Sequence, residues 1–142
     1  MRAHEKKNVE QHASFIEQFG IETEEARAWT DWFLTLPLWL ELGGLNLVHA
    51  CWDESKIDII KARRPDGRLH EEDLPEVATK STAFGLAVDY ILSGPELELP
   101  QGYVFHDYKG VPRKESRIAW WRPEARTWKE ACLESVRTFV YE

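Results

Sequence analysis

The chain has 142 residues, 43% of them hydrophobic, with a formal net charge of -7 and a pI near 5.3. This length suits one domain with its own apolar core. The acidic balance argues against general affinity for nucleic acid or an anionic membrane, because both attract basic faces. No long apolar run and no signal peptide occur, so we expect a cytoplasmic protein that binds neither nucleic acid nor membrane. Only two cysteines, Cys51 and Cys132, favour free thiols over a disulfide.

Two amphipathic helices are predicted at the start of the chain. The first covers residues 8–19, and Gly20 is placed to cap its C-terminus. The second begins after Thr23, a good N-cap residue, and stops before Pro37. Its apolar stripe is expected to lie in the core and not on a binding surface: Trp29, Trp32, Phe33 and Leu36.

The stretch 38–53, LWLELGGLNLVHACWD, predicts a β-hairpin. Residues 38–42 alternate between apolar and polar, which is the period of a half-buried strand. Gly43 and Gly44 supply the positive φ angles of a tight two-residue turn. Residues 45–52 are nearly all apolar, which predicts a second strand covered on both faces. The apolar face of the first strand is expected to carry Leu38, Leu40 and Leu42.

His49 is the one imidazole in the predicted second strand, close to its polar end. Ligands and metals gather beyond the carboxyl ends of strands in α/β sheets, which makes His49 a candidate metal ligand or general acid/base. A core histidine bonded to a backbone carbonyl is the alternative. Asp53 lies at the same rim and is a candidate to hold a metal ligand in place. Capping the next helix is the favoured role for Asp53.

A short helix is expected after Asp53 or Ser55, with Ile57 and Ile60 in the core. The acidic residues 71–73 are interpreted as a solvated face or a helix start.

A longer helix is predicted over residues 75–93, ended by Gly94 and Pro95. Its inward positions are Phe84, Ala87, Val88 and Ile91.

Two strands are predicted after this helix, at residues 103–108 and 116–121, joined through Lys109 and Gly110. A final helix is expected beyond Pro123. Its apolar positions would be Trp128, Cys132 and Val136.

Three arginines near these strands are candidate phosphate ligands, because a guanidinium binds phosphate bidentately: Arg113, Arg117 and Arg122. Surface charges flanking a hairpin are the favoured alternative. Trp120 and Trp121 beside them suggest a stacking platform for single-stranded nucleic acid, but the acidic total charge argues against it.

Residues 31–40, followed by residues 44–53, resemble the middle of bacterial calcineurin-like metallophosphoesterases, relatives of serine/threonine protein phosphatases and of diadenosine tetraphosphatase. In that family a Leu-Pro pair precedes a hairpin whose second strand delivers a histidine to a two-metal centre, and His49 holds that position here. The resemblance extends more loosely from residue 5 to residue 121. It implies an α/β fold over residues 1–142, namely a single partial domain forming an incomplete metallophosphoesterase-type sandwich, a mixed β-sheet with flanking helices.

The resemblance also implies a hydrolase chemistry. Two divalent ions (Mn, Fe, Zn or Ni) polarise a phosphoryl oxygen of a phosphoester or phosphoprotein substrate and generate the attacking hydroxide. The family takes its ligands from the motifs D-x-H, GDxxDRG and GNHE, a histidine like His49, and a late G-H motif. None of these four motifs occurs in this sequence, and only the pair His4-Glu5 matches part of GNHE.

We therefore expect the middle of a longer phosphoesterase, cut at both ends or encoded by a disrupted or split reading frame, and inactive alone. One alternative is a non-catalytic protein-interaction module that exposes strand edges and tryptophan-rich faces. Another is one half of a split phosphatase, completed by a complementary polypeptide.

Overall fold

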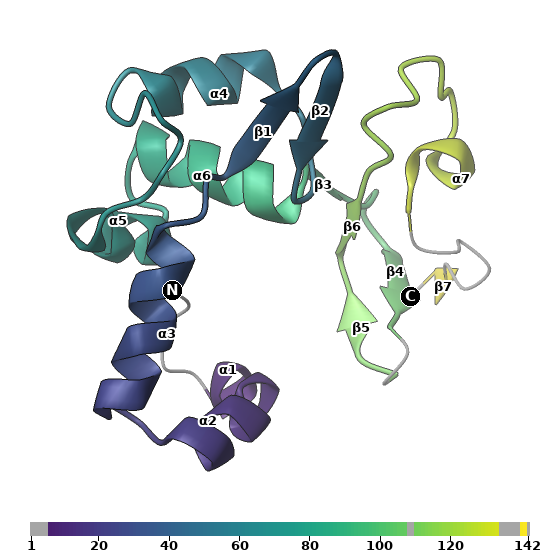
Figure 1. The fold of residues 1–142 in the computed structure, drawn as a ribbon. Coiled ribbons are helices and arrows are strands. Elements are labelled where there is room, and N and C mark those ends of the chain that lie inside the picture. The colour runs from purple at the N-terminus through teal and green to yellow at the C-terminus, as the bar shows by residue number, and fades with distance from the viewer. Residues whose placement is uncertain (1–5, 108–109, 134–139, 142) are drawn as a thin grey trace. The chain divides into compact units, whose positions relative to one another are not determined.

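The computed structural model describes residues 6–107, 110–133 and 140–141. The chain divides into two compact units, Met1–Leu92 and Ser93–Glu142 (Figure 1). The expectation of mixed α and β structure is confirmed. The described strands form small antiparallel sheets of two or three strands each.

Two short helices open the first unit where one was predicted. Helix α1 (Lys6–Gln11) and helix α2 (Ala13–Phe19) are separated at His12, which has φ -103° and ψ 9°. Gly20 caps α2 with φ 77°, as expected for a residue that must adopt positive φ.

Helix α3 (Glu24–Leu34) begins where the sequence predicts. The Thr23 hydroxyl accepts a hydrogen bond from the Ala26 N–H at 3.1 Å and so caps the helix. The expectation that its aromatic stripe lies in the core is wrong. Four side chains of that stripe are 42–53% exposed: Trp29, Trp32, Phe33 and Leu36.

The predicted hairpin is confirmed. Strand β1 (Trp39–Leu42) pairs antiparallel with strand β2 (Leu45–Val48), and Leu42 lies opposite Leu45. Gly43 and Gly44 form the turn with φ angles of 54° and 95°.

The faces and the length of the hairpin differ from the prediction. Trp39, 8% exposed, packs into the core, and Val48 lies opposite it on the same side. The second strand ends at Val48 and is not covered on both faces. The leucines that alternate with Trp39 point the other way and are 41–56% exposed: Leu40, Leu42, Leu45 and Leu47. Alternation revealed the two faces, but the contacts of Trp39 with α4 and α6 are what bury its face.

The core of the first unit lies between the hairpin, helix α4 (Glu54–Lys61) and helix α6 (Ala83–Ser93), which Figure 1 shows side by side. The predicted inward residues of both helices are confirmed. The buried cluster is Trp39, Ile57, Ile60, Phe84, Ala87, Val88 and Ile91.

The predicted helix over residues 75–93 is interrupted. A 3-10 turn, η1 (Glu71–Asp73), leads into α5 (Leu74–Thr79), and Lys80 then adopts the left-handed conformation at φ 52°. A separate helix, α6, then begins after Thr82. The Thr82 hydroxyl caps it by accepting a hydrogen bond from the Gly85 N–H at 3.0 Å.

In the described part of the second unit, the strands form two small sheets, accompanied by one short helix. Strand β3 pairs with β6, while β4 pairs with both β5 and β7. The predicted direct pairing of 103–108 with 116–121 is therefore wrong, because β4 pairs with the shorter strand β5 that comes just after Gly110, and β6 joins a different sheet. The final helix ends at Ala131, and Val136 lies outside the described residues. The elements are β3 (Glu96–Glu98), β4 (Tyr103–His106), β5 (Pro112–Arg113), β6 (Glu115–Arg117), α7 (Trp128–Ala131) and β7 (Val140–Tyr141).

Both cysteines are buried free thiols, as predicted. Within the described ranges, the helices are all too short or too polar to cross a membrane.

Candidate functional site

His49 follows β2 directly and is exposed to solvent. The prediction that it lies inside a buried strand is wrong. The backbone N–H groups of Ala50 and Cys51 donate to the carbonyl of Ile91 at 3.1 and 3.3 Å. These bonds draw the chain onto α6 and end the ladder, so the imidazole stands at the carboxyl end of β2.

His49 borders an apolar groove of about 520 Å³ in the first unit. Helix α3, the hairpin and the end of α6 contribute its walls. Among the described residues of these walls, His49 carries the one titratable side chain. Its apolar lining includes Phe33, Leu36, Leu40, Leu47, Val48 and Leu92.

Asp53 caps α4, which confirms the role favoured from the sequence. Its carboxylate accepts hydrogen bonds from the Ser55 hydroxyl at 2.6 Å and from the Lys56 N–H at 3.1 Å. The Ser55 bond is the largest influence on the pKa of Asp53 and lowers it. One carboxylate oxygen, Oδ1, receives both bonds, which is the geometry of a helix N-cap.

The described residues do not form a metal centre. They contain no group of three or more His, Cys, Asp or Glu side chains placed to hold an ion. A protein site for a catalytic transition metal commonly supplies three ligands or more. His49 together with Asp53, which caps α4, is too small a ligand set to complete a dinuclear centre within the described residues. His4 lies outside the described residues.

Arg113 and Arg117 are not brought together on one sheet. The Arg113 guanidinium donates to Asp107 Oδ2 through Nη2 at 2.7 Å and through Nε at 3.1 Å. The other oxygen of Asp107 accepts from the Val111 N–H at 3.0 Å. This pairing fastens the β4–β5 turn and supports the structural interpretation of Arg113. Arg117 is exposed on β6, where it lies opposite Glu96 of β3.

The tryptophan pair does not form a parallel stacking platform. The rings of Trp120 and Trp121 meet at an interplanar angle of 89°, with centroids 5.6 Å apart. Arg122 donates to the Glu130 carbonyl at 3.4 Å.

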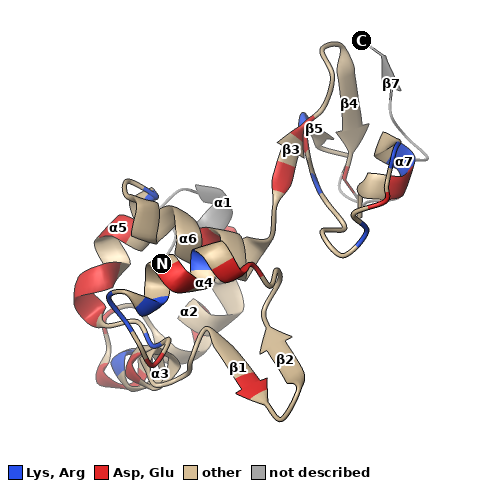
Figure 2. Cartoon of the chain, turned by 90° about the horizontal axis from the view of Figure 1, so that it is seen from above, with Lys and Arg blue, Asp and Glu red and all other residues tan. Residues whose placement is uncertain are grey.

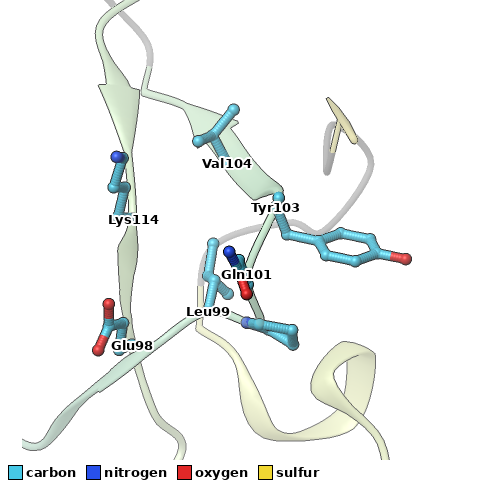
Figure 3. A pocket seen from close by; sticks show the side chains of 8 residues that line it. Glu98, Leu99, Gln101, Tyr103, Val104 and Lys114 are labelled. Carbon is cyan, nitrogen blue, oxygen red and sulfur yellow. The ribbon is translucent and has the colours of Figure 1, made fainter. Parts of the chain in front are cut away.

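A second hollow, of about 480 Å³, lies in the second unit (Figure 3). Among the described residues that line it, the charged ones are one carboxylate, Glu98, and one cation, Lys114. Neither Arg113 nor Arg117 lines it. This balanced lining gives no preference for a phosphate group.

A buried ion pair was not predicted from the sequence. Asp73 is 1% exposed, and Arg64 donates to its two oxygens through Nε at 2.8 Å and Nη2 at 3.0 Å. The His70 N–H donates to the same carboxylate at 2.8 Å. Burial raises the pKa of Asp73, but the bonds from Arg64 and His70 outweigh it and hold the pKa below its usual value. The sequence shows Asp73 only as the last of three acidic residues, without a signal that pairs it with Arg64.

The chain matches no protein-family model, no curated protein and no solved structure in comparisons with known proteins. The functional assignment therefore depends on the sequence resemblance and on the position of His49.

Proposed function

We propose that this chain is part of a metal-dependent phosphoesterase and that His49 supplies one ligand of its dinuclear metal centre. The observation that carries the proposal is the placement of His49. Its imidazole is exposed at the carboxyl end of a strand, directly after a hairpin preceded by Leu36 and Pro37. The resemblance described from the sequence expects a metal-binding histidine at this point.

The remaining ligands would come from residues beyond these 142, on the same polypeptide or on a complementary one. The described residues contain no group of three or more His, Cys, Asp or Glu side chains that could hold an ion. Imidazole nitrogen binds Mn, Fe, Zn and Ni, but two ions need carboxylates or further imidazoles as well. The chain by itself is thus expected to lack phosphoesterase activity.

The coding sequence on either side tests the assignment at little cost. We expect D-x-H, GDxxDRG and GNHE motifs upstream and a G-H motif downstream. A protein joining these regions should hydrolyse p-nitrophenyl phosphate in manganese. Flanking sequence without these motifs would contradict the proposal.

Two substitutions in that joined protein test the role of His49. His49→Ala should lower the activity by at least about 100-fold. Losing a residue that only hydrogen-bonds to a metal ligand already costs about 10–100-fold, and this substitution removes the ligand itself. His106→Ala is the matched control, since His106 is an exposed histidine on β4 with no proposed ligand role. Equal activity in the two variants would refute the assignment of His49. Hydrolysis of p-nitrophenyl phosphate by the 142-residue chain alone would refute the prediction that this chain is inactive by itself.

A further inference from the structure

The outward face of the β1–β2 hairpin consists of leucines. In the antiparallel register Leu40 lies opposite Leu47, and Leu42 lies opposite Leu45. Cross-strand partners project to the same side, and so do residues two apart along a strand. All four side chains therefore share one face, and each is 41–56% exposed.

This face continues onto helix α3. Leu40, Leu47 and Phe33 line the same groove. The Trp32 ring lies 5.2 Å from the Phe33 ring, measured between centroids, and is 48% exposed. We call the resulting surface the apolar patch: Trp32, Phe33, Leu40, Leu42, Leu45 and Leu47.

Together with the adjoining Trp29 and Leu36, the apolar patch has the apolar area of a standard-size interface. Taking about 200 Å² for an aromatic side chain and about 100 Å² for a leucine, the patch with its neighbours Trp29 and Leu36 exposes roughly 500 Å². A standard interface buries about 800 Å² on each partner, and homodimer interfaces are about 65% apolar. The apolar share of such an interface is also roughly 500 Å² per partner.

The hairpin carries almost no charge to oppose self-association. Its strands contain one charged residue, Glu41 on β1 (Figure 2). Glu41 alternates with the leucines and so projects to the opposite face, where Lys61 Nζ lies 3.3 Å from its carboxylate. Two copies can therefore bring their leucine faces together without burying a charge.

We propose that the apolar patch is the interface of a homodimer of this chain, in which two leucine faces pack around a two-fold axis. A symmetric contact of this kind uses the same surface on both copies. The dimer does not depend on the phosphoesterase assignment. Because each copy has a net charge of -7, added salt should strengthen the association by screening the repulsion between copies.

Sedimentation velocity of the full chain over a range of concentrations tests the proposal. We expect a reversible monomer–dimer equilibrium with a Kd of about 1–10 µM at about 0.15 M salt, at the weak end for an interface of this size. The double variant Leu42→Lys/Leu45→Glu replaces a cross-strand leucine pair by an opposite-charge pair that still supports the hairpin. Its dimer should be weaker by at least about 100-fold, since each of the two copies loses the apolar contact area of two half-exposed leucines.

Leu86→Lys is the matched control, because Leu86 lies on α6 outside the apolar patch and is 55% exposed. Its Kd should equal that of the unmodified chain. If the double variant proves unfolded by circular dichroism, Leu45→Thr keeps a strand-forming residue and should weaken the dimer about 5–10-fold. An unmodified chain that stays monomeric at about 100 µM overturns the proposal, given the expected affinity. A hairpin variant that dimerises as tightly as the Leu86→Lys control overturns it equally.

Discussion

Replacing Asp73 by asparagine is expected to destabilise the first unit strongly. The substitution keeps the shape of the side chain but removes its charge. In the native chain the carboxylate accepts two bonds from the Arg64 guanidinium and one from the His70 N–H. The Arg64 bonds tie the segment just after α4 to the last residue of η1, across the loop that contains Gly67.

The magnitude follows from the burial of Asp73. Removing one partner of a buried ion pair costs about 3–5 kcal/mol when the other charge stays buried and unpaired. Arg64 retains an alternative partner, because its Nη2 also lies 2.6 Å from Glu72 Oε1. We therefore expect a loss of about 2–4 kcal/mol in the free energy of unfolding.

Urea unfolding followed by tryptophan fluorescence measures this loss, since Trp39 lies in the same core. Glu72→Gln is the matched control: it removes the other carboxylate that contacts Arg64, but the Glu72 side chain is 74% exposed. It should cost less than about 0.5 kcal/mol, as exposed ion pairs do.

The effect of Asp73→Asn should also depend on pH. The pKa of Asp73 in the folded chain lies below its ordinary value, so the ionised carboxylate stabilises the fold above the unfolded pKa of about 3.9. That contribution is lost as the pH falls through the lower folded pKa. The stability difference between the native chain and Asp73→Asn should accordingly be full at neutral pH and shrink in acid below about pH 4. Equal losses for Asp73→Asn and Glu72→Gln, or a difference that persists unchanged in acid, would refute the reasoning.

Two further predictions concern a glycine and a thiol in the first unit. Gly67→Ala should cost about 2–3 kcal/mol in urea unfolding, because Gly67 has φ 69° and an added Cβ would lie 3.1 Å from the Trp39 ring. Gly43→Ala, with φ 54° and open space around it, should cost only about 1 kcal/mol; equal costs would contradict the packing argument. Cys51 should react slowly with Ellman's reagent at about pH 8, because burial, followed by the charge of Asp53, raises its pKa to about 11. Urea should make the reaction fast, and rapid labelling of the folded chain would show that the thiol is accessible.

Local signals in the sequence predicted several elements correctly. Thr23 caps a helix and Asp53 caps another because each has a side-chain oxygen next to free N–H groups. Gly43 and Gly44 form the turn because few other residues accept positive φ in succession. The inward positions of α4 and α6 followed from helical periodicity.

Features set by distant contacts were not predictable in this way. The buried face of the hairpin depends on what Trp39 meets in α4 and α6, and alternation alone does not distinguish the two faces. The pair between Arg64 and Asp73 joins residues nine positions apart across a loop. His49 emerged at the surface because two backbone bonds to Ile91 stop the strand early, and periodicity carries no information about such bonds.

The metal content of an extended protein tests the central claim most directly. The chain would be produced together with its flanking coding regions, and the ions per polypeptide measured by mass spectrometry. We predict two divalent ions in the extended protein and a clear loss of metal in its His49→Ala variant, with no loss in His106→Ala. Unchanged metal content in the His49→Ala variant would contradict the claim that His49 binds metal.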